Sequence, residues 1–112
     1  MRTTLKPVVI AAAFAAAITA ITAGPAIATE RHIVEIIKFK FVPAEVKAAP
    51  GDTIIWINKD IVPHTITAAD KSWDSGTIAK AAEWQTVVRS DMPGAYFCRF
   101  HPAMKARFTV SQ

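Results

Sequence analysis

Short runs of β-branched and aromatic residues, separated by turn residues, make up most of the chain after residue 30. The runs that predict strands or extended segments cover residues 32–41, 45–48, 53–58, 62–68, 84–89, 95–98 and 106–110. Proline and glycine residues separate several of them. The only stretch with helical character, residues 78–83, is too short to matter. Seven or so closely spaced strands predict an antiparallel β-sandwich or barrel.

Two of these runs do not alternate regularly. In residues 32–41 the alternation slips near Ile36 and Ile37, which predicts a β-bulge or a strand that passes from one sheet to the other. Residues 53–58, with the sequence TIIWIN, are apolar at nearly every position. We expect this second run to be partly buried on both faces.

The N-terminal segment has a different pattern. Residues 8–23 carry no charge and follow two basic residues, Arg2 and Lys6. A Gly-Pro pair at 24–25 and a small-x-small sequence ending at Ala28 come next. This pattern is typical of a secretory signal peptide, and the apolar run is short for a membrane span. We expect residues 1–28 to be removed and residues 29–112 to form a periplasmic domain that has no membrane attachment. The alternative is an uncleaved N-terminal anchor, which the Gly-Pro break disfavours.

Length, charge and cysteine content narrow the function. A chain of 112 residues allows one domain. Its net charge of +4 falls by two when the signal peptide is removed, which does not support nucleic-acid binding. Cys98 is the single cysteine, so no disulfide can form within the chain. An unpaired cysteine in a small exported domain suggests an intermolecular disulfide, a reactive thiol or a metal ligand.

The cysteine lies in a C-x-x-H-x-x-M sequence, before the last predicted strand. Cys98, His101 and Met104 provide three donor side chains, and His64, 34 residues earlier, provides a fourth. Zinc does not use methionine as a regular ligand, whereas a thiolate and a thioether together favour copper. Two histidines and a cysteine with a weak axial methionine are typical of a blue-copper electron-transfer site. Each residue alone has a structural explanation as core filler or solvated side chain, but the four together favour a metal site.

Longer stretches of the sequence resemble the cupredoxins, the type 1 blue copper proteins related to plastocyanin and pseudoazurin. The resemblance covers nearly all of residues 32–112. It is carried by the sequences PGDT at 50–53 and WIN at 56–58, by Pro63-His64, and by GAYFC-x-x-HP-x-M at 94–104. The two-residue gap between His101 and Met104 resembles the amicyanin branch. The resemblance implies a Greek-key β-sandwich of seven to eight strands that binds one copper ion.

Carried over to this chain, the resemblance makes His64, Cys98, His101 and Met104 the copper ligands. It makes Asn58 the side chain that holds the ligand loop in place, although Asn58 is also a common turn residue. Arg99-Phe100 stands where amicyanins typically have Thr-Pro. We therefore expect a less stiff loop with a positive charge beside the metal.

The expected function is electron transfer through His101, the ligand on the loop that we expect to reach the surface. The residues expected to form a docking surface around it are Pro63, Arg99, Phe100, Pro102, Ala103 and Lys105. Lys105, with Arg107 nearby, could equally be a solvated strand residue. The resemblance implies a quinoprotein amine dehydrogenase as electron donor and a c-type cytochrome as acceptor. We expect a monomer.

Two other functions remain as alternatives. A copper enzyme needs further histidines, and only His32, expected on a solvated strand end, is unassigned, so we expect no enzymatic activity. A copper-delivery protein would use the same ligands but often has clusters of methionines. Only Met92 and Met104 remain after signal cleavage, which makes that alternative weaker.

Overall fold

The computed structural model describes residues 2–20 and 28–112. Residues 2–20 form no helix or strand, and their side chains are exposed. The Gly-Pro pair and Ala26 of the expected cleavage site lie outside the described residues. Within the two described ranges, no helix is long and apolar enough to cross a membrane. The signal peptide and its cleavage after Ala28 therefore stay predictions.

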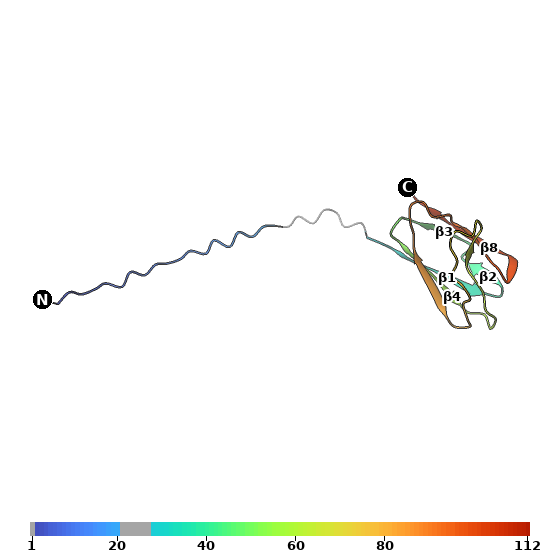
Figure 1. Cartoon of the computed structure of the whole chain (residues 1–112), viewed down its shortest axis with the longest axis horizontal. Coiled ribbons are helices and arrows are strands. Elements are labelled where there is room, and N and C mark those ends of the chain that lie inside the picture. Colours follow the sequence, from blue (N-terminus) through green and yellow to red (C-terminus); the bar gives the residue numbers. More distant parts are fainter. Residues whose placement is uncertain (1, 21–27) are drawn as a thin grey trace.

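Two four-stranded sheets face each other to form a β-sandwich (Figure 1). The first has the order β2-β1-β4-β6, and the second has the order β3-β8-β7-β5. The strands are β1 (Arg31–Ile37), β2 (Lys40–Val42), β3 (Glu45–Ala48), β4 (Thr53–Asn58), β5 (Thr67–Ala68), β6 (Glu83–Val87), β7 (Ala95–Cys98) and β8 (His101–Val110). Pairing is parallel between β1 and β4 and between β3 and β8, and antiparallel elsewhere. The predicted all-β sandwich of seven to eight strands is confirmed.

The first predicted run is a hairpin rather than one irregular strand. The chain turns back at Lys38 and Phe39, which have φ angles of 51° and 60°. β1 and β2 then pair in antiparallel register, with Ile36 opposite Phe41. The expected bulge or crossing between sheets is therefore wrong at Ile36-Ile37. The turn carries neither glycine nor asparagine, the residues that normally mark a left-handed turn.

Three other segments differ from the predicted strands and helix. Residues 62–68 contribute only the two-residue strand β5, although His64 also forms a bridge with Ile78. Residues 78–83 form no helix, and β6 begins at Glu83. β8 begins at His101, five residues before the predicted start of the last strand. His101 and Met104, expected in a loop, therefore lie within this strand.

The core between the sheets is built around Trp56, which is fully buried. Its ring lies 5.4 Å from the ring of Trp84 and 5.5 Å from that of Tyr96. Gly94, the residue before β7, lies close against β8, and a Cβ atom there would overlap the carbonyl oxygen of Phe108. This packing fixes the ends of β4, β7 and β8, from which the candidate site is built.

Candidate metal centre

The donor residues come from two neighbouring strands of the second sheet and from the connection between β4 and β5. Cys98 ends β7 and His101 begins β8, and the two are paired across the turn formed by Arg99 and Phe100. His64 lies on the connection after β4, where its backbone exchanges two hydrogen bonds with Ile78. Backbone pairing therefore positions all three donors before any metal binds.

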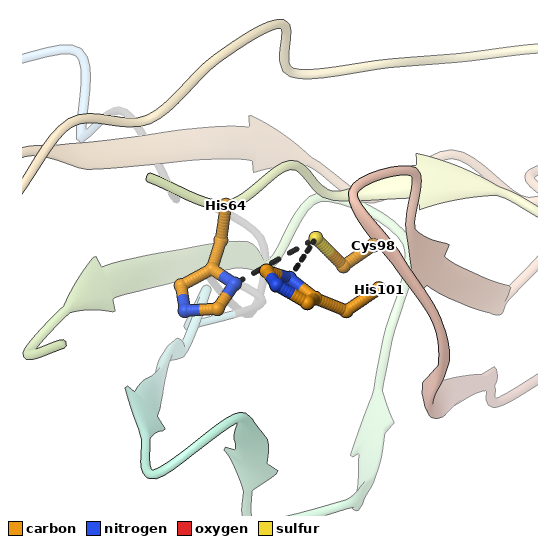
Figure 2. Close-up of side chains that lie close together, drawn as sticks. All are labelled: His64, Cys98 and His101. Carbon is orange, nitrogen blue, oxygen red and sulfur yellow. Dashed lines mark hydrogen bonds between the residues drawn. The ribbon is translucent and has the colours of Figure 1, made fainter. Parts of the chain in front are cut away.

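The three side chains point toward one another (Figure 2). Sγ of Cys98 lies 3.6 Å from Nδ1 of His64 and 3.8 Å from Nδ1 of His101. Metal–sulfur and metal–nitrogen bonds of about 2.3 and 2.0 Å, at about 120° to each other, would place sulfur and nitrogen about 3.7 Å apart. Both sulfur–nitrogen distances therefore fit a trigonal metal ion, and the three donor atoms all lie within 4.8 Å of one another. Met104, three residues along β8 from His101, is also buried.

A carboxylate orients His64. Nε2 of the fully buried His64 lies 2.8 Å from Oδ2 of Asp60. Asp60 also accepts the backbone N–H groups of Lys38 and Phe39. Partial burial raises the pKa of Asp60, but the hydrogen bonds from Phe39, His64 and Lys38 outweigh it and hold that pKa below its ordinary value. Asp60 thus links the β1–β2 turn to the metal site as an anion.

Asn58 holds the chain around His64 rather than the Cys98–Met104 segment. Its amide nitrogen donates to the carbonyl oxygens of Val62 and Ile78, at 2.9 and 3.0 Å. Its Oδ1 accepts the backbone N–H of Asp60. Asn58 is therefore placed to fix one ligand, which differs in detail from the role that the resemblance implied.

Thr65 connects the segment after His64 to the Cys98 turn. Its backbone N–H points to Sγ of Cys98 at 3.4 Å, and its hydroxyl accepts the N–H of Arg99 at 2.8 Å. The guanidinium of Arg99 forms an ion pair with Asp74, Nε to Oδ2 3.1 Å. Hydrogen bonds therefore hold the Arg99-Phe100 turn, which lacks the proline typical of amicyanins. The ion pair with Asp74 partly neutralises the positive charge of Arg99.

Phe39 covers the two imidazoles from the β1–β2 turn. Its ring centroid lies 5.5 Å from that of His64 and 4.8 Å from that of His101, edge-on to both. Neither Phe39 nor Asp60 was identified from the sequence. Asp60 lies only four residues before His64, and this spacing could have indicated a bond between them. The position of Phe39 depends on a turn that contains no glycine or asparagine to indicate it.

The residues expected to form the docking surface all lie at the protein surface. His101 itself is half-buried, while its neighbours are exposed: Pro63, Arg99, Phe100, Pro102, Ala103 and Lys105. Ile61 and Phe39 add exposed apolar surface that was not predicted. The half-buried imidazole is the natural point of contact between the centre and solvent.

A second group of metal-type donors, Glu30, His32 and Asp52, lies near the start of β4. The Asp52 carboxylate is already engaged by the backbone N–H groups of Glu30 and Ala49 and by His32 Nε2 at 2.9 Å. These hydrogen bonds are typical of a structural role, in which Asp52 holds together the start of β1, the end of β3 and the start of β4. His32 lies at the start of β1, as predicted, but its side chain is only 18% exposed and is bonded to Asp52 instead of being solvated.

Comparison with known proteins agrees with this geometry. Residues 28–111 match the family described as copper binding proteins, plastocyanin/azurin family. The chain belongs to this family of copper-binding proteins. It is 31% identical over 85 residues to amicyanin from Paracoccus versutus and 26% identical over 88 residues to amicyanin from Paracoccus denitrificans. Each match covers 70% of this cupredoxin but only 63% of the relative.

Solved structures show the same fold. A reduced amicyanin variant superposes with a TM-score of 0.62 and 26% identity, covering 72% of this chain and 82% of that one. A purple cupredoxin from Nitrosopumilus maritimus gives 0.65 and 24%, covering 71% and 99%. A copper-containing nitrite reductase from Thermus scotoductus gives 0.65 and 18%, covering 73% and 22%. The last two likenesses concern the fold alone. The predicted cupredoxin family and its copper cofactor are confirmed.

Proposed function

We propose that this cupredoxin is an exported blue copper protein that carries single electrons between redox partners. His64, Cys98, His101 and Met104 would hold one type 1 copper ion. The observation that carries the proposal is the convergence of the Cys98 sulfur and two imidazole nitrogens at 3.6 and 3.8 Å. Copper held there would supply reversible one-electron chemistry.

The residues around the donors suit a carrier better than an enzyme. Cys98 and His64 are fully buried and Met104 is nearly so, which leaves little room for a substrate beside the donors. A catalytic metal needs an open coordination position and commonly more histidines. The one remaining histidine, His32, is bonded to Asp52, just before β4 begins, whereas His64 follows the end of β4. His32 therefore lies at the opposite end of that strand from the donors.

Electron transfer would occur at the edge of His101. An apolar surface with a charged rim suits a brief encounter, because redox complexes use small interfaces. Pro63, Phe100, Pro102 and Ala103 would form the apolar part, with Lys105 at the rim. By resemblance, the donor would be a quinoprotein amine dehydrogenase and the acceptor a c-type cytochrome.

Export would place the domain in the periplasm. The family match begins at residue 28, which supports removal of residues 1–28 and a functional domain of residues 29–112. The mass of the protein isolated from the periplasm would test this boundary, since an uncleaved anchor would keep the full chain.

The absorption spectrum of the copper-loaded protein tests the function. We expect an intense blue thiolate-to-copper band that disappears on reduction and returns on reoxidation. The Cys98→Ser variant should lose the band, whereas Met92→Leu, a buried change outside the donor set, should keep it. A protein that binds Cu(I) but shows no reversible blue form would instead be a copper-delivery protein.

A further inference from the structure

Thr65, Thr67 and Asp74 form a chain of hydrogen bonds that leads from the metal centre to the protein surface. The hydroxyl oxygens of Thr65 and Thr67 lie 3.0 Å apart, and both residues are buried. Oγ1 of Thr67 lies 3.1 Å from Oδ1 of Asp74, which is exposed. At the inner end, the backbone N–H of Arg99 donates to Oγ1 of Thr65 at 2.8 Å. The chain therefore connects a surface carboxylate to the residue that follows Cys98.

The charge of Asp74 fixes the direction of the hydrogen bonds in this chain. An ionised carboxylate only accepts hydrogen bonds, whereas a hydroxyl has one proton to donate. Thr67 therefore donates its proton to Asp74 and must accept the proton of Thr65. The Thr65 oxygen keeps a lone pair for the backbone N–H of Arg99. Hydrogen bonds in a chain polarise one another, so the carboxylate strengthens the bond at the ligand turn.

Asp74 also holds the side chain of Arg99. Its Oδ2 lies 3.1 Å from Nε of Arg99, while its Oδ1 accepts the backbone N–H of Gly76 at 3.0 Å. The backbone of Asp74 is itself paired with that of Thr67 in an isolated bridge. Arg99 is thus bound twice, by its backbone through the two threonines and by its guanidinium directly. An exposed ion pair alone holds a turn weakly, so the buried hydroxyls are the stronger connection.

We infer that Asp74 is a positioning residue of the metal centre and acts through Thr67 and Thr65. The chain holds the peptide between Cys98 and Arg99, and thereby the direction in which Cys98 presents its sulfur. Thr65 takes part twice, because its own N–H points to Sγ of Cys98 at 3.4 Å. Hydrogen bonds around a cysteine sulfur tune the potential of copper bound to it. The effect on the potential rests on the proposed function, whereas the effect on the turn needs no metal.

Hydrogen exchange of the Arg99 backbone amide in the copper-free protein tests the chain. We expect Asp74→Ala and Thr67→Val each to speed this exchange by about tenfold, as for the loss of about one hydrogen bond. The double variant D74A/T67V should exchange no faster than Asp74→Ala, because both changes break the same chain. Glu45→Gln, which removes an exposed carboxylate paired with Arg107, is the matched control and should keep the native exchange rate.

The reduction potential of the copper-loaded protein tests the effect on the sulfur donor. Thr67→Val leaves the charge of the protein unchanged, so it acts on the centre through hydrogen bonds alone. A looser turn weakens the N–H contact from Thr65 that offsets the negative charge of the Cys98 thiolate. A more electron-rich thiolate favours Cu(II), so we expect a lower potential. Glu45→Gln should keep the native potential.

Three results would overturn the inference. One is native exchange at Arg99 in both single variants. A second is an equal acceleration at the amide of Trp56 in the core, which would mean a general loss of stability. The third is a native potential in Thr67→Val, which would leave the chain a purely structural role. Circular dichroism of each variant confirms folding. A protein without a reversible blue form would refute the proposed function, while exchange at Arg99 would still decide whether Asp74 holds the ligand turn.

Discussion

Asp60 and His64 form a buried carboxylate–imidazole pair with 2.8 Å between Oδ2 and Nε2. An ionised carboxylate only accepts hydrogen bonds, so Nε2 of His64 must be the donor. A neutral imidazole carries one ring proton, which leaves Nδ1 with a free lone pair directed at Cys98. Asp60 therefore selects the form of His64 that can bind a metal.

The Asp60→Asn variant should raise the reduction potential of the copper-loaded protein. The amide oxygen can still accept the hydrogen bond, but the negative charge that stabilises the more positive oxidised state is lost. Potentiometric titration measures this shift. Asp70→Asn, a change to an exposed carboxylate bonded to Ser72, is the control and should leave the potential unchanged. Equal potentials for Asp60→Asn and the native protein would contradict a tuning role.

Phe39 should slow the loss of copper. Its ring packs edge-on against both imidazoles and shields them from solvent. We expect Phe39→Ala to lose copper to a chelator several-fold faster, followed by the decay of the blue band. Phe100→Ala removes another exposed ring, which lies beside the Arg99 guanidinium, and the copper-loss rate of this variant should stay native. Equal rates for the two variants would mean that Phe39 does not protect the centre.

Met104→Gln should lower the reduction potential while copper stays bound. An amide oxygen is a harder donor than a thioether and favours Cu(II) over Cu(I). Cyclic voltammetry measures the change, with Met92→Leu as the control because Met92 is also buried. A potential that is unchanged or higher in Met104→Gln would show that Met104 is not the axial ligand.

The sequence predicts the donor set because copper chemistry restricts residue type and spacing. Cys98, His101 and Met104 lie within seven residues, and only two other histidines remain. Strands at 45–48, 53–58 and 95–98 were also predicted with their observed bounds, since their residue types match a half-buried sheet. These features depend on local sequence.

Asn58 was predicted as a supporting residue, but Phe39 could not be predicted because its position depends on tertiary structure. Phe39 reaches both histidines only because the β1–β2 turn places Lys38 and Phe39 in the left-handed region. No glycine or asparagine marks that turn. Asp60 gains its role from the same turn, whose backbone N–H groups it accepts.

Copper should stabilise the fold. A metal held by His64 and Cys98 closes a loop of more than thirty residues and binds the native state preferentially. We expect the melting temperature to fall by several degrees when copper is removed. At a ligand concentration a thousand times the Kd, the stabilisation is about 4 kcal/mol. Cys98→Ala should show little difference between copper-treated and untreated samples. Identical melting curves for the native protein with and without copper would contradict this prediction.

Asp52 should make the stability of the protein fall in acid, independently of copper. The hydrogen bond from the Glu30 backbone, together with those from His32 and Ala49, lowers the pKa of Asp52 from its ordinary 3.8 to about 2. The folded state therefore favours the charged carboxylate more strongly than the unfolded state does. This contribution is fully present above about pH 4 and is lost as the pH falls toward 2.

The Asp52→Asn variant should be less stable than the native protein at neutral pH, because the amide replaces one strong acceptor oxygen. The two proteins should converge in stability as the pH falls from about 4 to about 2, since protonation removes the same charge from the native protein. Urea unfolding of the copper-free proteins across this range measures the difference. Asp91→Asn, at an exposed site near Arg89, is the control, and its stability should follow the same pH dependence as that of the native protein. If the difference in unfolding free energy between Asp52→Asn and the native protein stayed constant down to pH 2, the stabilising effect of the hydrogen bonds to Asp52 would not depend on its charge.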